Sequence, residues 1–249
     1  MEERIKPLEV DQARQATDTI RGYVYQIWQS LYKWIHLADD EILYLEGAED
    51  FDVLSPDKSV AIQVKHLSKT LTLHSSDITE AISNFWKLSQ REKRNVIFQF
   101  LTTAEKGQEQ GNPFNGFTGL DYWDQCKNGG GVSHLKNFLL GLNGLPLDLT
   151  NFIKTSSDKD FLKGLVIPIE CSMGEGDLEG IRKQVENDLI VYGGKHNYSA
   201  ADSKRAAAIL YDKVCTILCI KNFRGRHLTK ASFIEIFEDR HFALGGPLP

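Results

Sequence analysis

Acidic and polar residues that could bind a divalent cation are concentrated between residues 46 and 65. Asp52 lies in the segment FDVL, and the next strand-like segment carries Gln63, Val64 and Lys65. Alternate residues of a β-strand share a face, so Gln63 and Lys65 are expected to point the same way. Hard oxygen ligands bind Mg²⁺, and a nearby lysine offsets the charge of a phosphate. The pattern therefore predicts metal-dependent hydrolysis of a phosphodiester.

Two further acids lie between these strands. Glu46 ends the preceding strand-like segment, and Asp50 lies in the intervening turn, so each is a candidate catalytic residue. Asp52 is expected to be the principal ligand, because the apolar pair after it continues the strand. The expected cofactor is Mg²⁺, with Mn²⁺ as an alternative. The expected ligands are Asp52, Gln63, Glu46 and the carbonyl of Val64.

Lys65 has a separate expected function, which is to orient or help deprotonate the attacking water. A purely structural role for these residues also stays open, because Gln63 and Lys65 suit an amphipathic edge strand. An acid followed by QxK occurs by chance in many proteins. The order of the surrounding elements favours the site.

The charge distribution supports a polyanionic substrate, although the net charge is −5. Residues 39–56 contain seven acids and no Lys or Arg, whereas residues 57–94 contain seven Lys or Arg against four acids. Carboxylates can hold cations while neighbouring basic groups hold a nucleic acid. The expected DNA contacts are Lys69, Lys87, Arg91, Lys93 and Arg94.

Hydrophobic periodicity places these residues on an α/β core. A helix is expected over residues 17–37, strands over 41–46, 51–54 and 60–66, a helix from residue 76, and a strand over 95–103. The last strand is almost continuously apolar, as in a strand buried on both faces. A right-handed crossover through the second helix would make it parallel to the 60–66 strand.

The rest of the chain is predicted to be largely helical. The middle is loop-rich with a short helix over 133–142, and further helices are expected over 148–154, 177–191, 200–220 and 227–240, the last one capped by Thr229. The run LVIPIE (165–170) is strand-like. We expect a core with the metal site over 1–110, a helical and loop-rich remainder over 111–225, and a C-terminal helix and tail over 226–249. The abrupt ending GGPLP leads us to expect a further domain beyond it.

Several other classes of protein lack support in the sequence. The four cysteines form no CxxC pair, so neither a zinc site nor a disulfide framework is predicted. No apolar run is long enough to cross a bilayer, and the N-terminus has no apolar signal region, so a cytoplasmic protein without a membrane partner is expected. The glycine-rich segments fit neither a P-loop nor a dinucleotide-binding loop.

The segments GYVYQIW (22–28), LEGAEDFDVL (45–54), AIQVKH (61–66), DITEAISNFW (77–86) and FQFLTTA (98–104) carry a family resemblance. They resemble the double-stranded DNA endonuclease domain of bacterial anti-phage effectors. Such domains occur in CD-NTase-associated (CBASS) nucleases, in some AVAST-type ATPases and in nucleases paired with HerA-type ATPases. They are similar to Mrr-type restriction enzymes, which also favour QxK. The resemblance covers residues 15–105 well and the remainder loosely.

This resemblance implies a PD-(D/E)xK restriction-endonuclease-like core with a helix-β-β-β-helix-β mixed sheet and a helical C-terminal portion. It implies a catalytic set of Asp52, Gln63 and Lys65, with Glu46 and Asp50 as further members. Gly22, Tyr23 and Gln26 match the family helix, although helix packing accounts for them equally well.

The predicted function is a metal-dependent endonuclease that cuts double-stranded DNA in anti-phage defence. Its activity would be gated by homo-oligomerisation or by a partner, such as a HerA-type ATPase or a nucleotide-sensing domain. The alternative is a catalytically silent assembly domain that binds a partner ATPase or sensor protein.

Overall fold

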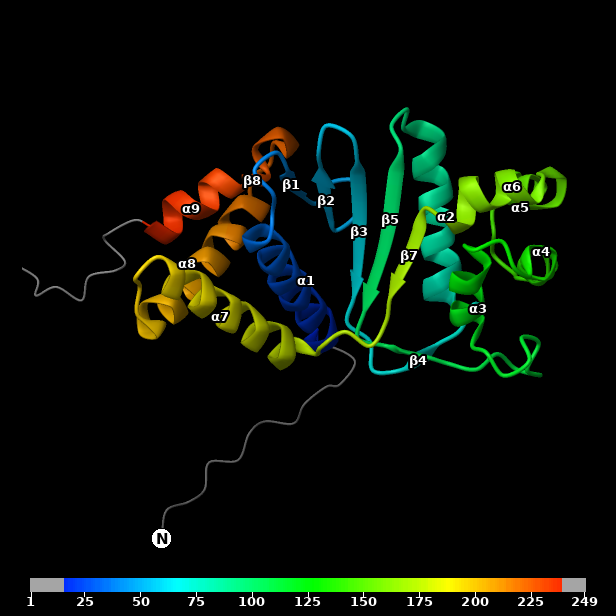
Figure 1. Cartoon of the computed structure of the whole chain (residues 1–249), viewed down its shortest axis with the longest axis horizontal. Helices are drawn as coiled ribbons and strands as arrows, with labels where there is room; N and C mark the ends of the chain where they lie inside the picture. The colour runs from blue at the N-terminus through cyan, green and yellow to red at the C-terminus, as the bar shows by residue number, and fades with distance from the viewer. Residues whose placement is uncertain (1–15, 239–249) are drawn as a thin grey trace, which may run out of the picture.

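A six-stranded mixed sheet forms the centre of the molecule in a computed structural model that describes residues 16–238. The strand order is β7-β5-β3-β2-β1-β8, as Figure 1 shows. The strands are β1 (Ile42–Leu45), β2 (Phe51–Leu54), β3 (Ser59–Lys65), β5 (Val96–Thr102), β7 (Ile169–Ser172) and β8 (His227–Thr229). A separate two-stranded sheet joins β4 (Thr70–Leu71) to β6 (Glu105–Lys106).

The sheet combines an antiparallel part with a parallel part. Strands β8, β1, β2 and β3 pair antiparallel, whereas β3, β5 and β7 pair parallel. Helix α2 (Ser76–Arg91) links β3 to β5, so the predicted crossover and the parallel pairing are confirmed. The mixed α/β class predicted from the sequence is also confirmed.

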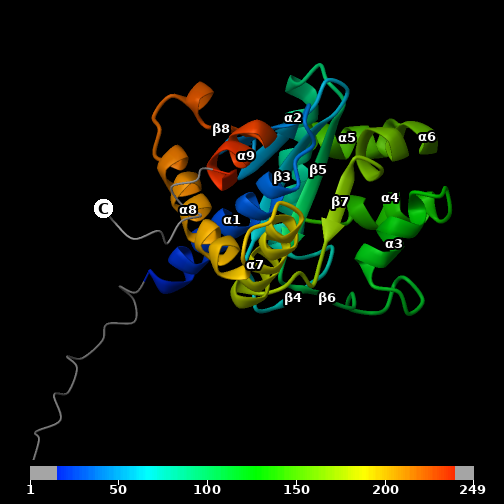
Figure 2. The same ribbon diagram turned by 60° about the vertical axis from the view of Figure 1, so that its left-hand side comes forward.

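Helices cover both faces of the sheet, in two groups that Figures 1 and 2 separate. On one face lie α1 (Thr17–Ile35), α7 (Leu178–Lys195), α8 (Ala200–Leu218) and α9 (Lys230–Glu238). On the other lie α2, α3 (Gly119–Cys126), α4 (Val132–Leu140), α5 (Leu147–Thr155) and α6 (Asp158–Phe161). The alternation within β3 divides its side chains between these cores: Ile62 and Val64 pack with α1, and Ala61 packs with α2.

Two sequence expectations are wrong in detail. The run LVIPIE is not one strand, because residues Leu162–Val166 form a π-helical turn and β7 begins only at Ile169. Pro168 precedes that strand and lacks the N–H that a ladder needs. Residues 227–229 are a strand and not the start of a helix, since they pair with β1. Thr229 nevertheless caps the helix as predicted, with its Oγ1 accepting the Ser232 N–H at 3.1 Å.

The three segments expected from the sequence all contribute to this sheet. Strands β1, β2, β3 and β5 come from residues 1–110, β7 comes from 111–225 and β8 comes from 226–249. The expected end of the last helix at residue 240 and the GGPLP ending lie outside the described residues.

No helix among residues 16–238 combines the length and the apolar character needed to cross a membrane.

Candidate active site

An open pocket of about 320 Å³ lies where β3 ends, between helix α1 and the loop that joins β1 to β2. Its wall contains five of the residues predicted from the sequence, namely Glu46, Asp50, Gln63, Val64 and Lys65. Helix α1 completes it with Thr19, Gly22, Tyr23 and Gln26. Tertiary structure therefore brings most of the predicted set together.

Asp50 is bound tightly to the strand that carries QxK. Its Oδ2 accepts the backbone N–H of Val64 at 2.6 Å. Burial raises the pKa of Asp50, while this hydrogen bond, the Gln26 side chain and the Lys65 charge oppose that rise. The carboxylate is therefore held next to Gln63 and Lys65, where its charge has both a donor and a cation nearby.

Gln63 and Lys65 each leave a polar group available. The Gln63 side chain is 7% exposed, and its Oε1 accepts no hydrogen bond from a described residue. A buried acceptor without a partner costs about 1–3 kcal/mol, so this oxygen should bind a cation or a water molecule. Lys65 is half-buried and forms no ion pair with a residue in the described range, so its charge is free to meet a phosphate.

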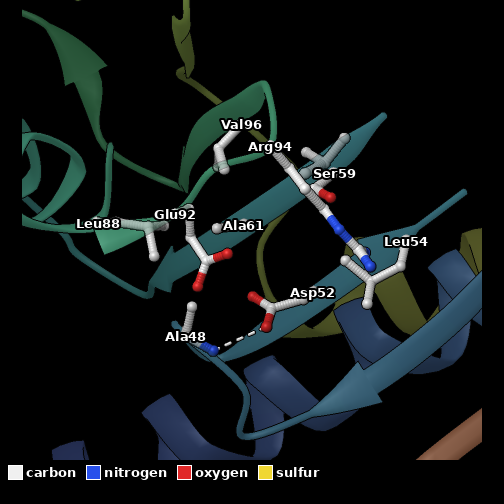
Figure 3. Close-up of a pocket in the computed structure, with 10 residues that line it drawn as sticks. Ala48, Asp52, Leu54, Ser59, Ala61, Leu88, Glu92, Arg94 and Val96 are labelled. Carbon is white, nitrogen blue, oxygen red and sulfur yellow. Dashed lines mark hydrogen bonds between the residues drawn. The ribbon is translucent and has the colours of Figure 1, made fainter. Parts of the chain in front are cut away.

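Asp52, the expected principal ligand, lies outside this pocket. Its Oδ2 accepts the Ala48 N–H at 2.7 Å, and it faces a second pocket of about 140 Å³ beside Glu92 and Arg94 (Figure 3). Gly47 passes so close that an added Cβ would lie 1.9 Å from Asp52 Oδ2. Asp52 therefore holds the loop that carries Asp50. Asp52 lies within β2, as the sequence predicted. It is Asp50, in the preceding turn, that contacts the Val64 N–H.

Burial also perturbs the other carboxylates around the loop. It raises the pKa of Asp52 to about 6, despite the hydrogen bonds from the loop backbone. It raises the pKa of Glu49 to about 7, with the neighbouring charges of Asp50 and Asp52 adding to the effect. Glu49 was counted among the acids of the sequence but was not predicted to have a functional role. Its position in a run of acids without any Lys or Arg was the available signal.

Glu46 occupies an unusual backbone conformation at the rim of the pocket. Its φ is +50°, a left-handed value that is uncommon outside glycine, asparagine and aspartate. Its N–H donates to the carbonyl of Asp50 at 2.9 Å, which closes the loop. Burial and Asp50 raise the pKa of Glu46, and Arg226 opposes them. Strained residues cluster at functional sites, so this conformation agrees with a role for the loop.

The donor atoms restrict the kind of metal site that is feasible. Within residues 16–238, no three His, Cys, Asp or Glu side chains are grouped so as to hold a metal ion. Asp50, Gln63 and Val64 all line the pocket, so their oxygens are the candidate donors. Mg²⁺ in catalytic sites commonly uses one or two carboxylates, with water and substrate phosphate as further ligands. These residues could hold Mg²⁺ or Mn²⁺ only in that open form, and not in a closed structural site.

The five basic residues expected to contact DNA do not form one surface around the pocket. Lys69 lies at the site end of the sheet, where its Nζ pairs with Asp77 at 2.7 Å. Arg94 lines the second pocket together with Ser59, at the opposite end of β3. Ser59 and Lys65 are six residue steps apart along the strand, a distance of about 20 Å. Lys87, Arg91 and Lys93 belong to the end of α2 and the turn after it, on the Arg94 side.

Helix α1 contributes pocket residues that the family pattern had already marked. A Cβ on Gly22 would meet nothing within 4 Å, so helix packing does not require this glycine. Gly22, Tyr23 and Gln26 all line the pocket. His66 also lines it, with its ring edge against Tyr25 at 5.1 Å between centroids.

Two solved structures share this fold. One is the Acinetobacter baumannii Cap4 SAVED/CARF-domain containing receptor with the cyclic trinucleotide 2'3'3'-cAAA, at a TM-score of 0.53 and 13% identity. The match covers 91% of this chain and 47% of the receptor chain. The other is the Moraxella osloensis Cap4 SAVED/CARF-domain containing receptor, at a TM-score of 0.51 and 12% identity, covering 91% and 49%. The chain therefore spans about half the length of each receptor.

Comparison of the sequence adds no closer relationship, because no protein-family model and no curated protein matches it.

Proposed function

We propose that this chain is a metal-dependent endonuclease that cleaves double-stranded DNA as the effector of an anti-phage defence system. The observation that carries the proposal is that Asp50, Gln63 and Lys65 line one open pocket, where the buried Gln63 Oε1 and the Lys65 ammonium have no partner among the described residues. A restriction-endonuclease-like core, as the sequence resemblance implies, is part of this proposal. The fold shared with about half of each Cap4 receptor supports the assignment to defence.

Each residue has a distinct part in the proposed reaction. Asp50 and Gln63 Oε1 would hold Mg²⁺, with the Val64 carbonyl as a further candidate ligand. Bound Mg²⁺ would supply Lewis-acid stabilisation of the phosphate charge that develops during attack by water. Lys65 would orient the attacking water and offset the charge of the scissile phosphate. Val64 positions Asp50 through its N–H.

The proposal includes control of the activity, since an ungated nuclease would damage the host. The neighbours are described as receptors, one of them with a cyclic trinucleotide, and this chain spans about half of each. We therefore propose gating by homo-oligomerisation through a nucleotide-sensing domain, or by a partner such as a HerA-type ATPase.

Nucleotide sensing by this chain itself is the second candidate, and the cyclic trinucleotide of the Acinetobacter baumannii receptor favours it. The charge of the pocket argues against it. The pocket offers one lysine, Lys65, beside the carboxylates of Glu46 and Asp50, which is few positive charges for the three phosphates of a cyclic trinucleotide. Direct titration of the chain with a cyclic trinucleotide, with and without Mg²⁺, distinguishes sensing from cleavage.

Cleavage of a supercoiled plasmid tests the proposal. The wild type should nick and linearise DNA with Mg²⁺ or Mn²⁺ but not with EDTA, and Lys65→Ala and Asp50→Asn should each be inactive. Lys58→Ala is the matched control, because Lys58 is exposed in the turn at the far end of β3. If purified oligomeric protein never cleaves, or if the two site variants cleave like wild type, the silent assembly domain becomes the better interpretation.

A further inference from the structure

A group of basic residues lies beside the pocket, on the segment that leads into β8. Residues 213–234 contain five Lys or Arg and no acid. Three of these five, Lys221, Arg224 and Arg226, fall within the short segment 221–227, which also contains His227. We call residues 221–227 the basic loop.

The basic loop is held firmly against the edge of the sheet. The Arg226 carbonyl accepts the Leu45 N–H at 2.9 Å, and His227 pairs with Tyr44 across β8 and β1. Phe223 stacks on Tyr44 at 5.5 Å between ring centroids. Asn222 accepts the Arg224 N–H at 3.1 Å, which shapes the turn. The loop is therefore a preformed surface with a fixed position relative to β1.

Two cations of the basic loop are exposed and have no ion-pair partner among the described residues. These two are Lys221 and Arg224. Arg226 donates from Nε to the Ile220 carbonyl at 2.6 Å and thereby braces the loop. Its charge acts on Glu46, the rim residue of the pocket. The loop therefore places uncompensated positive charge next to an acidic site.

The distance between the basic loop and the Lys65 pocket corresponds to a few base pairs of a DNA duplex. β8 is three strands from β3 in the sheet, which corresponds to about 14 Å at the usual spacing between strands. Successive base pairs rise about 3.4 Å along B-DNA, so this distance spans about four base pairs. A duplex with one phosphate at Lys65 could thus place backbone phosphates against the basic loop.

We infer that the basic loop binds the phosphate backbone of a DNA duplex whose neighbouring phosphate enters the Lys65 pocket. This inference rests on the proposed function and gives it a contact surface that the α2 residues do not provide. An anionic membrane is the competing partner for a basic surface with an exposed aromatic residue. Phe223 argues against it, because one face of its ring is already stacked on Tyr44.

Binding of a labelled short duplex in EDTA tests the inference without any cleavage. The variant Lys221→Ala/Arg224→Ala removes the two exposed cations, and Lys154→Ala/Lys159→Ala is the charge-matched control. Lys154 and Lys159 are exposed on α5 and α6, on the opposite side of the molecule from β8 (Figure 1). Affinity is measured by fluorescence anisotropy between about 50 and 200 mM salt.

The expected result is a flatter salt dependence for the loop variant only. Each lost phosphate contact reduces the slope of log affinity against log salt by about 1, so the double variant should lose about 2. The control should keep the wild-type slope, and the charge-preserving variant Lys221→Arg/Arg224→Lys should restore it. Circular dichroism establishes that all variants are folded.

Three results would overturn the inference: no duplex binding by the wild type, equal slopes for loop and control variants, or binding to phosphatidylserine vesicles in place of DNA. Failure of the proposed nuclease function looks different. In that case the duplex would bind through the loop in EDTA, yet no plasmid cleavage would follow on addition of Mg²⁺.

Discussion

Replacing Glu49 by glutamine should change how the stability of the protein depends on pH. The pKa of Glu49 is raised from 4.5 to about 7, chiefly by burial and then by Asp50 and Asp52. A folded-state pKa above the unfolded value means that the folded protein favours the protonated acid. Its contribution to stability is therefore fully present below about pH 4.5 and is lost as pH rises through about 7. Glu49→Gln removes this titration and its pH-dependent penalty.

The size of the effect follows from the pKa difference. One pH unit corresponds to about 1.4 kcal/mol, so the gap between 4.5 and about 7 sets an upper limit of roughly 3 kcal/mol. Glu49 is only half-buried, and solvent screening reduces the value that is realised. We expect Glu49→Gln to gain about 1–2 kcal/mol relative to wild type between pH 5 and pH 8.

The measurement is urea unfolding of wild type and Glu49→Gln at pH 5 and pH 8 in EDTA. The change in unfolding free energy between pH 5 and pH 8 is compared between the two proteins. The contributions of the other titrating groups cancel in this comparison. Glu235→Gln is the control, because Glu235 is exposed on α9. A difference below about 0.3 kcal/mol, or a loss of stability at pH 8, would refute the raised pKa of Glu49.

Three further predictions concern the same loop and pocket. Lys65→Ala should abolish plasmid cleavage while changing the unfolding free energy by less than about 1 kcal/mol, because Lys65 makes no ion pair with a described residue; retained cleavage would contradict the catalytic role. A divalent cation at a hundredfold excess over its Kd should stabilise the wild type by about 2.7 kcal/mol, and Asp50→Asn should lose most of this response while Asp52→Asn keeps it. Thermal melts in EDTA, Mg²⁺ and Mn²⁺ measure this stabilisation. An equal loss of stabilisation in the two variants would place both acids at the cation. Gly47→Ala should destabilise the protein by about 1–3 kcal/mol in urea unfolding, since its Cβ would collide with Asp52; a neutral effect would show that the loop can move aside.

Local periodicity was sufficient to predict several strands and helices of this protein. Alternation of residue types placed Gln63 beside Val64 and Lys65 on a strand, and the apolar run over 95–103 identified its parallel neighbour. Strand and helix periods are properties of neighbouring residues, so they can be read without knowledge of the fold. The resemblance to a nuclease family depended on the same segments.

Tertiary structure decided which acid accompanies QxK. Asp50 and Asp52 are two residues apart, and no sequence pattern indicates that the Val64 N–H binds one while the Ala48 N–H binds the other. The burial of Glu49 depends in the same way on how the loop folds back on the sheet. Local propensity cannot specify such contacts, because they depend on the path of a turn.

Long-range pairing decided where the basic residues lie. The expected DNA contacts lie between residues 69 and 94, yet four of them, on the end of α2 and the turn after it, lie at the opposite end of the sheet from Lys65. Residues 221–227 are far away in sequence, yet β8 pairs with β1 and brings Arg226 beside Glu46. Charge composition indicated that a polyanion could be a partner. Only the order of strands in the sheet determines which charges face the pocket, since strand pairing joins segments that the chain separates.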